Sequence, residues 1–443
     1  MTNPTIPFRA ALFDLDGTLL DSGRVWQDVD RRFFAARGIE IDQAGYARAV
    51  QGLSFREAAV YTVRRFGLDE SVEAVMAEWM DMAREEYALH VALKPGARGY
   101  LRFLKRNGVR LAVATANRPE LFMPALERTG VRELFDAFCT SADVGDASKA
   151  DGALYRLAAQ RLGVAEADCA VFEDVPEGVK GARRCGMRVY AVRDAATDPS
   201  AIDALADGAI DRFDEMRRYH SLDEPPRRCV IFTALCEGDP RRAYAPRAGD
   251  CVLCADAGWR LARRLGVKPD LVIGDFDSSE EPADEATRRV PAEKDDSDTM
   301  LCLKRGLQMG LDDFLIVGGF GGRIDHTLAN LQALHYAARR GASIRMRDGL
   351  RWAAAVADGA LRVHANVLGD GPVKLSVFAL TDACRGVSIR GAKYALEDGS
   401  LTSAFPLGLS NEFASDAAEI SVKRGALLVT VCREPDVDIP SRP

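Results

Sequence analysis

Apolar runs of strand length alternate with helix-length amphipathic segments along most of this 443-residue chain. Because parallel neighbouring strands need a long crossover connection, usually a helix, this alternation predicts α/β folding on mainly parallel sheets. The first half holds four such runs, at residues 9–13, 109–115, 167–174 and 187–192. A long insert with helical periodicity, about residues 23–91, separates the first run from the second and predicts a helical lid.

The pattern restarts after residues 221–228, where acids and two prolines indicate a linker between two halves. Strand-like runs then end in loops rich in Gly or Asp, at residues 229–235, 249–258, 270–278 and 313–322. These runs predict a second α/β domain.

The last part of the chain has a different pattern. From about residue 358, short strand-like runs follow one another with turn residues and no helix between them, which predicts a small β-sandwich. We therefore expect folded regions at 1–220, 229–355 and 356–443, with 221–228 as the linker.

Composition narrows the class of protein. Apolar residues make up 47% and charged residues 28%, and the net charge of −7 gives no general attraction for nucleic acid or an anionic membrane. No stretch has the length of a membrane-spanning segment, and the first apolar run stops at Asp14, so we expect a cytoplasmic protein without a secretion signal. The one CxxC pair, Cys251 and Cys254, lies in an apolar run and predicts buried thiols.

Polar residues follow the strands of the first half. Asp14 and Asp16 stand two residues apart, so in an extended segment their carboxylates point the same way, which favours a hard cation such as Mg²⁺ between them. Thr115 ends the second run, Lys149 follows a loop, and Asp174 ends the third run. A hydroxyl, a cation and acids are thus expected at one sheet edge, where open α/β sheets bind ligands.

These motifs resemble those of the haloacid dehalogenase superfamily of phosphatases, with a Rossmann-like core and the insert as its helical cap. The resemblance implies that Asp14 attacks phosphorus to form an aspartyl phosphate and that Asp16 protonates the leaving group. It also implies that Thr115 and Lys149 hold phosphate oxygens. Mg²⁺ would lie among the acids of these motifs, namely Asp14, Asp16 and Asp174.

One segment departs from the family's pattern. The family usually continues the motif lysine with proline, whereas this sequence has SKADG at residues 148–152. A proline there shapes only the loop, so activity is still expected, but the position of Lys149 is less well predicted than those of the acids.

A second set of acids follows the strands of the second half. Asp256, Asp275, Asp277 and Asp298 are too many carboxylates for one site without a divalent metal, and Mg²⁺ with substrate phosphates fits them. A Gly-rich loop precedes Arg323, so backbone NH groups can approach phosphates there while the guanidinium grips oxygens.

Residues from about 229 to 443 resemble thiamine pyrophosphokinase. The resemblance implies transfer of a diphosphate from ATP to the hydroxyl of thiamine, with release of AMP. Asp275, Asp277 and Asp298 would hold metal and phosphates, with Asp277 and Asp298 in catalytic roles and Asp256 close by.

The same resemblance assigns the substrate contacts. Arg323, Asp325 and Asn330 would contact ATP or shape its loop, and Ser410 and Asn411 would contact thiamine. It also implies a homodimer through the C-terminal half, because the thiamine pocket of the related kinases lies between two subunits.

Joining the two halves suggests one pathway, in which the first hydrolyses thiamine monophosphate to thiamine and the second converts thiamine to thiamine diphosphate. The first half is alternatively a phosphatase for an unrelated small ester such as phosphoglycolate or a sugar phosphate, or a catalytically silent module. The cap, above all residues 51–58, is expected to select the ester. For the second half the rival class is a binding sensor, against which the full set of acids argues.

Overall fold

The computed structural model consists of two compact units, Met1–Glu224 and Pro225–Pro443, which are described separately below. The residues that the structure describes are 6–433 without positions 51, 52, 54, 146, 195–198, 223–226, 277–280, 284, 292 and 294. Asp277 and part of the cap segment 51–58 therefore lie outside the described residues.

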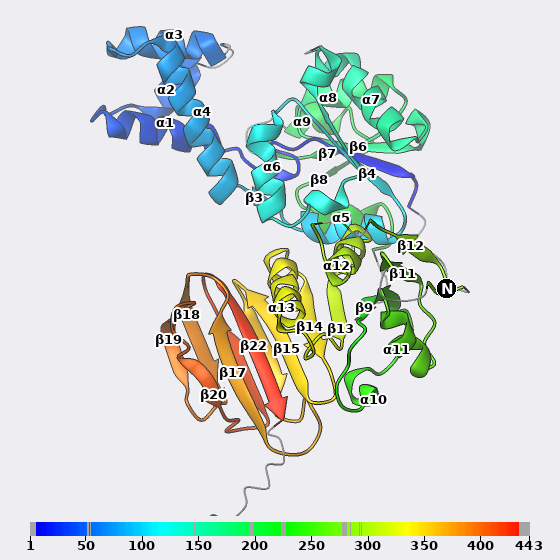
Figure 1. The fold of residues 1–443 in the computed structure, drawn as a ribbon. Helices are drawn as coiled ribbons and strands as arrows, with labels where there is room; N and C mark the ends of the chain where they lie inside the picture. The colour runs from blue at the N-terminus through cyan, green and yellow to red at the C-terminus, as the bar shows by residue number, and fades with distance from the viewer. Residues whose placement is uncertain are drawn as a thin grey trace, which may run out of the picture. The chain divides into compact units, whose positions relative to one another are not determined.

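The first unit is built on a six-stranded parallel sheet (Figure 1). The strands in spatial order are β5 (Ala137–Thr140), β4 (Arg110–Thr115), β1 (Ala10–Phe13), β6 (Cys169–Glu173), β7 (Arg188–Val192) and β8 (Gly208–Ile210). The four strands predicted from the sequence are the central ones. The two additional strands, β5 and β8, lie at the edges of the sheet and are short.

Side-chain alternation along β1 places one apolar core on each face of this sheet. Phe13 belongs to one core and stacks on Phe172 with ring centroids 4.5 Å apart, whereas Leu12 belongs to the other core together with Tyr155. The helices of the core region are α5 (Ala97–Arg106), α6 (Pro119–Arg128), α7 (Ala153–Leu162), α8 (Pro176–Arg184) and α9 (Pro199–Asp203).

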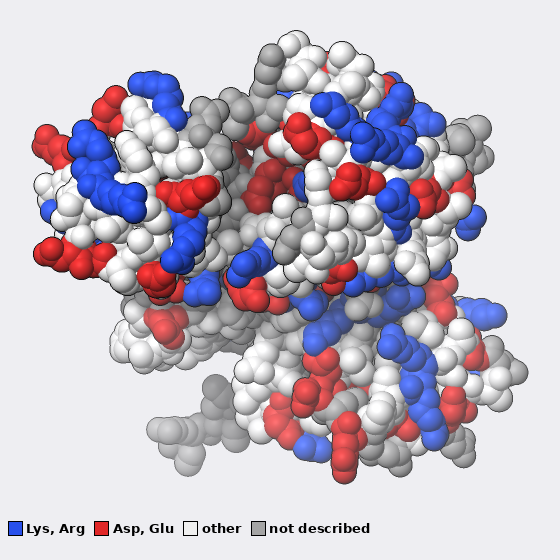
Figure 2. Space-filling view, turned by 90° about the horizontal axis from the view of Figure 1, so that it is seen from above, with Lys and Arg blue, Asp and Glu red and all other residues white. Residues whose placement is uncertain are grey.

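The insert forms a helical cap, as predicted. Its helices are α1 (Val25–Ala36), α2 (Gln43–Val50), α3 (Phe55–Phe66) and α4 (Val72–Leu89), and its two connections pair as β2 (Leu20–Asp21) and β3 (Ala92–Leu93). Aromatic side chains fill the cap, with Phe33 packed edge-on against Phe34 and Trp79. Figure 2 shows a hollow between the cap and the core, with acidic side chains inside it.

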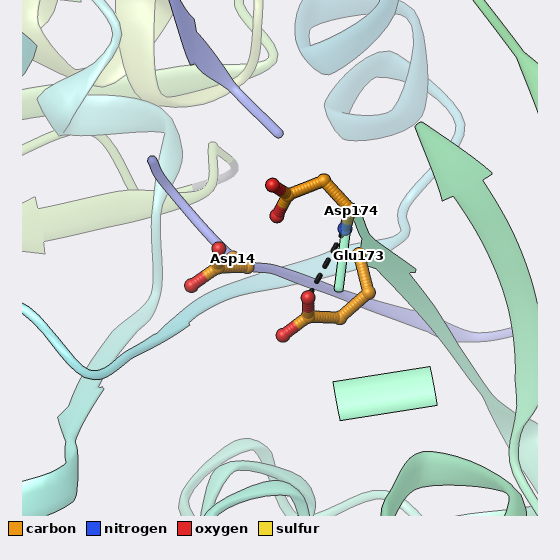
Figure 3. A group of neighbouring side chains, drawn as sticks. All are labelled: Asp14, Glu173 and Asp174. Atoms are coloured by element: carbon orange, nitrogen blue, oxygen red, sulfur yellow. Dashed lines mark hydrogen bonds between the residues drawn. The ribbon is translucent and has the colours of Figure 1, made fainter. Parts of the chain in front are cut away.

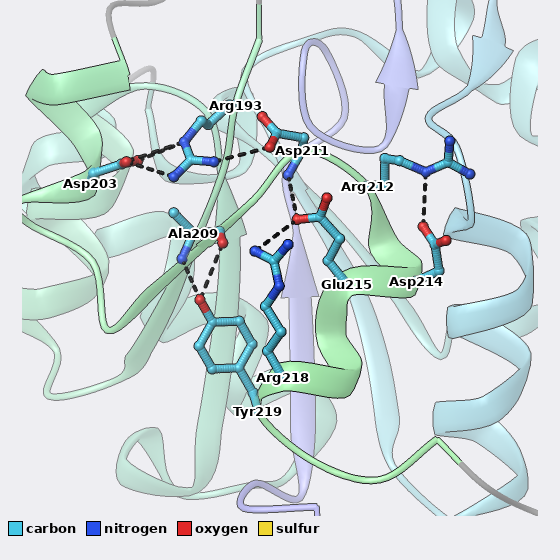
Figure 4. A network of polar contacts seen from close by, with 9 residues as sticks. All are labelled: Arg193, Asp203, Ala209, Asp211, Arg212, Asp214, Glu215, Arg218 and Tyr219. Carbon is cyan, nitrogen blue, oxygen red and sulfur yellow. Dashed lines mark hydrogen bonds and ion pairs between the residues drawn. The ribbon is translucent and has the colours of Figure 1, made fainter.

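Polar contacts fasten the end of the first unit onto its sheet (Figure 4). The hydroxyl of Tyr219 accepts a hydrogen bond from the backbone N–H of Ala209 in β8 at 2.8 Å. Arg193, just after β7, forms ion pairs with Asp203 at 2.8 Å and with Asp211 at 3.1 Å. These contacts attach the 3₁₀ segment Phe213–Arg218 and the edge strand to the rest of the sheet.

The second unit contains a ten-stranded sheet that is parallel from β12 to β14 and antiparallel from β14 onward. Its strands in spatial order are β12 (Thr287–Arg289), β11 (Leu271–Gly274), β10 (Cys251–Ala255), β9 (Arg228–Phe232), β13 (Asp313–Val317), β14 (Ser343–Arg347), β15 (Arg351–Ala357), β22 (Ala426–Arg433), β17 (Val373–Ala379) and β20 (Gly408–Asn411). The helices of this unit are α10 (Pro240–Ala243), α11 (Gly258–Arg264), α12 (Asp298–Gln308) and α13 (Ile324–Arg339).

A four-stranded sheet completes the predicted sandwich. It consists of β16 (Ala360–His364), β21 (Ala417–Ser421), β18 (Ala383–Arg390) and β19 (Leu396–Thr402). Its buried side chains share one apolar core with β15, β17 and β22 of the larger sheet. The expected division at residues 355 and 356 falls inside β15, because the large sheet runs without a break from the α/β region into the sandwich.

Two further expectations concern membranes and thiols. No helix among the described residues is both long and apolar enough to cross a membrane. The cysteines are free thiols, and Cys251 and Cys254 are buried as predicted.

The cap contains a carboxyl group whose titration should affect stability. Burial raises the pKa of Asp30, on α1, from 3.8 to about 6. Because the folded state binds this proton more tightly than the unfolded chain, the stabilisation is full below pH 4 and is lost as the pH rises through 6. We expect Asp30→Asn to raise the melting temperature above pH 6 and to leave it nearly unchanged at pH 4, as measured by circular dichroism. The exposed cap variant Asp69→Asn is the control, and a gain from Asp30→Asn that is equal at both pH values would contradict the prediction.

Candidate active sites

Three buried carboxylates meet at the carboxyl edge of the first sheet. Asp14 directly follows β1, Glu173 ends the neighbouring strand β6, and Asp174 comes next. One carboxylate oxygen from each lies within 4.8 Å of the others (Figure 3). Their exposed fractions are 4%, 0% and 6%, so water does little to separate their charges.

Lys149 provides a cation among these acids. Its Nζ lies 2.6 Å from Asp14 Oδ1 and 2.6 Å from Glu173 Oε1. Burial raises the pKa of Asp14 well above its usual value, although Lys149 opposes the rise. Burial disfavours the charged form of Lys149 too, but Asp14 and Glu173 outweigh it and raise the pKa of the lysine. The lysine therefore stays protonated at neutral pH.

The acids fit a divalent cation. Burial and the carboxylate of Glu173 raise the pKa of Asp174 to about 6. Three carboxylates share one lysine, and carboxylate oxygens are the ligands that Mg²⁺ prefers, so Asp14 and Asp174 could hold it. The Oγ1 of Thr18 donates to Asp174 Oδ1 at 2.9 Å and orients that carboxylate.

Glu173 has a different position from Asp174, and the sequence did not reveal its role. Its carboxylate binds Lys149 and accepts a hydrogen bond from the Tyr155 hydroxyl at 2.7 Å. It therefore positions the lysine from behind the site. The sequence shows two adjacent acids at the end of this strand, but only the fold shows that Glu173 contacts the lysine and Asp174 contacts Thr18.

Asp16 lies apart from this group, which differs from its expected place among the metal ligands. Asn117, which follows β4, donates from Nδ2 to Asp16 Oδ2 at 2.8 Å, and the hydroxyl of Tyr87 donates to Asp16 Oδ1. Its side chain thus faces the cap, as a group that protonates a leaving group would. Thr115 ends β4, is 1% exposed, and accepts a hydrogen bond from the backbone N–H of Asn117 at 3.1 Å.

Tyr87 connects the cap with Asp16. It stands near the end of α4, and burial together with Asp16 raises its pKa, so the hydroxyl keeps its proton and acts as a donor. It also accepts a hydrogen bond from Asn117 Nδ2 at 3.1 Å. No spacing pattern in the sequence indicates this contact, because Tyr87 lies in the insert.

The second site is a cavity of about 750 Å³ in the second unit. Asp256 follows β10, Asp275 follows β11, and Asp298 begins α12, where Ser297 caps the helix by accepting from Met300 N at 3.2 Å. The acids that line this cavity are Asp256, Asp275, Asp295, Asp296 and Asp298. The structure thus brings together the predicted acids that it describes.

The Gly-rich loop and the start of α13 form another wall of the cavity, with Arg323, His326 and Asn330. Arg323 forms an exposed ion pair with Asp325 at 2.5 Å, and Asn330 Nδ2 donates to Gly319 O at 2.9 Å. Gly319 has φ +86°, a conformation that residues with a side chain rarely adopt. Asn330 therefore shapes the loop, while Arg323 and His326 are exposed beside the cavity.

The expected thiamine contacts are not among the residues that line this cavity. Ser410 and Asn411 lie on β20, at the edge of the large sheet. The side chain of Asn411 accepts from Tyr394 N at 2.9 Å and donates to Tyr394 O at 2.8 Å, so it fixes a neighbouring backbone segment. Ser410 has φ +59° and donates its backbone N–H to Ser376 Oγ at 3.0 Å.

The first site is thus a group of buried carboxylates with one lysine in a capped α/β domain, and the second pairs acids with a Gly-rich loop. The sequence matches the haloacid dehalogenase-like hydrolases over residues 8–186. It also matches the catalytic domain of thiamin pyrophosphokinase over 246–346 and the vitamin B1 binding domain of that enzyme over 370–427.

Each of the relatives described next aligns with less than half of this chain. The phosphorylated carbohydrates phosphatase of Thermotoga maritima is 27% identical over 45% of this chain and 92% of its own length. The validoxylamine A 7'-phosphate phosphatase of Streptomyces hygroscopicus is 30% identical over 48% of this chain and 98% of its own. The bifunctional riboflavin kinase/FMN phosphatase of Arabidopsis thaliana is 30% identical over 41% of this chain and 47% of its own.

Among solved structures, thiamine pyrophosphokinase from Bacillus subtilis aligns with 47% of this chain and 99% of its own, at 22% identity and a TM-score of 0.41. The chain belongs to the haloacid dehalogenase-like hydrolases through its N-terminal half, and it carries the two thiamin pyrophosphokinase domains in its C-terminal half.

The position of Lys149 depends on close packing against α8. A Cβ added at Gly181, on that helix, would overlap the carbonyl oxygen of Lys149. We expect Gly181→Ala to lower phosphatase activity by about tenfold or more, because a displaced lysine no longer balances the buried acids. Gly99→Ala, on α5, is the matched control, since a Cβ there meets open space and should stabilise the helix by about 0.5–1 kcal/mol. Equal activity of the two variants would contradict the prediction.

The contact between Tyr87 and Asp16 leads to a leaving-group test. General acid catalysis contributes about 10²–10⁴-fold for a leaving group that needs a proton, and p-nitrophenolate leaves without one. We expect Tyr87→Phe to lower kcat/KM for an alkyl phosphate by about tenfold and to leave kcat/KM for p-nitrophenyl phosphate nearly unchanged, because this ratio reports phosphoryl transfer to the enzyme and not the later release of phosphate. Tyr61→Phe, a change elsewhere in the cap, should affect neither ester. A uniform loss on both esters would show that Tyr87 does not act through Asp16.

Proposed function

We propose that the C-terminal half transfers diphosphate from ATP to thiamine and that the N-terminal half hydrolyses thiamine monophosphate to thiamine. The observation that carries the proposal is the presence, in one chain, of an intact phosphatase acid–lysine group and an acid-lined kinase cavity. The product of the first reaction would be the substrate of the second.

In the phosphatase half, Asp14 attacks phosphorus while Lys149 balances charge on the phosphate and on Asp14. The bond between phosphorus and the leaving oxygen breaks, and Asp16 gives that oxygen its proton. Asp16 then takes a proton from the water that releases phosphate from Asp14. Thr115 binds a phosphate oxygen. Asp14 and Asp174 would hold Mg²⁺, which would supply the charge neutralisation that an attack by one anion on another requires.

In the kinase half, the residues act by alignment. Asp256, Asp275 and Asp298 surround the cavity, and they would hold Mg²⁺ that neutralises the phosphates of ATP. Arg323 grips phosphate oxygens, and the backbone NH groups of the Gly-rich loop approach them closely. The thiamine hydroxyl attacks the β-phosphorus, and AMP leaves.

The choice of thiamine monophosphate rests on domain pairing. The relative from Arabidopsis thaliana is named bifunctional riboflavin kinase/FMN phosphatase, so it too pairs a kinase with a phosphatase in one chain. A phosphatase joined to the kinase half of this chain would supply thiamine from its monophosphate. Since other relatives are named for carbohydrate phosphates, a different small ester is the second candidate.

A homodimer through the C-terminal half is part of this proposal. Large apolar side chains beside Ser410 and Asn411 are strongly exposed in the single chain, namely Tyr394 at 64%, Phe405 at 64%, Leu407 at 59% and Leu409 at 57%. A second copy would cover them and complete a thiamine pocket near β20.

Two variants test the proposal by each disabling one half. The full chain is given thiamine monophosphate, ATP and Mg²⁺, and thiamine, thiamine diphosphate and phosphate are followed together. We expect wild type to form thiamine diphosphate, Asp14→Asn to do so only from added thiamine, and Asp298→Asn to accumulate thiamine. Either variant serves as the folding control for the other half.

The outcomes separate the two activities. If wild type and Asp14→Asn both convert thiamine and neither acts on thiamine monophosphate, the first half is assigned to another ester. Near-normal thiamine diphosphate formation by Asp298→Asn would contradict the metal and phosphate role of that residue.

A further inference from the structure

A cavity of about 540 Å³ lies between the cap and the core of the first unit. Cap residues from α1, α3 and α4 line one side, and the segment after β4, including Asn117, lines the other. Asn117 also donates to Asp16 at 2.8 Å. Because Asp16 protonates the leaving oxygen in the proposed reaction, the leaving group of the ester would occupy this cavity.

The cap side of the cavity is aromatic and apolar. Trp26 at the start of α1 lies with its ring centroid 5.5 Å from that of Phe55 at the start of α3. Met76 and Met80 stand one turn apart on α4 and line the same cavity. Trp26 is 44% exposed, so its ring is available to a ligand and is not committed to the core.

Several polar groups of the cavity have partners already, and Arg118, which also lines it, is exposed. Asp81 and Arg84 form an ion pair with each other at 2.6 Å. Asn117 uses its amide N–H groups on Asp16 and Tyr87, and its Oδ1 accepts from Arg118 N at 2.7 Å. Against the walls formed by Trp26, Phe55, Met76 and Met80, a polyhydroxylated leaving group would therefore find few partners for its hydroxyls, and each hydroxyl left unpaired costs binding energy.

An aromatic leaving group suits the same walls. Aromatic side chains pair with rings by offset or edge contacts, and their faces attract cationic rings as well as neutral ones. Thioether side chains adapt to irregular shapes and contact rings favourably. The cavity also has the volume of a small-molecule site, so a leaving group of two or three carbons would leave most of it empty.

We propose that the first unit prefers phosphate monoesters whose leaving group carries an aromatic ring, and that Trp26, Phe55, Met76 and Met80 select for that ring. The inference rests on the proposed phosphatase activity of this unit, but it does not depend on which ring-bearing ester is the natural one. Thiamine monophosphate belongs to this class, whereas phosphoglycolate and the sugar phosphates do not.

The test compares primary phosphate esters with and without an aromatic ring, here called ring-bearing and other esters, on the full-length protein with Mg²⁺. The ring-bearing probes are thiamine monophosphate, pyridoxine 5'-phosphate and FMN, and the others are ribose 5-phosphate, glucose 6-phosphate and phosphoglycolate. We expect kcat/KM to be at least about tenfold higher for the best ring-bearing ester than for any other. Preference for a sugar phosphate or for phosphoglycolate would overturn the proposal.

Variants assign the preference to these side chains. Trp26→Ala and Met80→Ala should each lower kcat/KM for the best ring-bearing ester by about fivefold or more, mainly through KM, and lower kcat/KM for phosphoglycolate by less than about twofold. Leu89→Ala removes another exposed apolar side chain of the cap, 55% exposed and outside the cavity lining, and should change neither. An equal loss on both esters in the two cavity variants would overturn the assignment.

The outcomes also separate this inference from the proposed function. If pyridoxine 5'-phosphate or FMN is hydrolysed well and thiamine monophosphate is not, ring selection stands and the thiamine step fails. If no ester is hydrolysed, p-nitrophenyl phosphate included, the phosphatase activity fails and this inference is overturned with it.

Discussion

Parallel strand pairing brings the carboxyl ends of neighbouring strands to one edge of a sheet, and both candidate sites of this chain lie at such an edge. In the first unit, β1 and β6 deliver Asp14 and Asp174 side by side. In the second, Asp256 and Asp275 follow the neighbouring strands β10 and β11. The carboxyl edge of each sheet therefore concentrates negative charge, and other groups of each site must supply the positive charge that balances it.

The first unit balances the charge with a buried lysine held from two sides. Glu173 and Asp14 both contact Lys149, and the hydroxyl of Tyr155 donates a hydrogen bond to Glu173. Truncating one partner of a buried charge pair costs about 3–5 kcal/mol, which is a large part of a domain's stability. The same ion pairs thus support the fold and hold Asp14, the proposed nucleophile, in place, whereas Asp16, hydrogen-bonded to Tyr87 of the cap, does not take part in them.

The sequence predicted the parts of the structure that are encoded locally. Strand ends identified Asp14 and Asp174, because a strand followed by an acid is a short-range pattern. The contact of Tyr87 with Asp16 joins residues 71 positions apart through the insert, and no periodicity marks it. The different positions of Glu173 and Asp174 depend on which of the two carboxylates contacts Lys149. Ser410 lies away from the kinase cavity because β20 pairs at the far edge of the large sheet. Such long-range pairings are set by the whole fold.

The order of strands in the large sheet has a consequence for synthesis on the ribosome. β22 lies between β15 and β17, although it is the last of the three to be made. Until residues 426–433 emerge, both neighbours present an open edge to other chains, whereas the sheet of the first unit is complete once β8 has been made. A nascent chain stopped before residue 426 would thus carry a finished phosphatase sheet and an unfinished kinase sheet, and only the second would call for a chaperone.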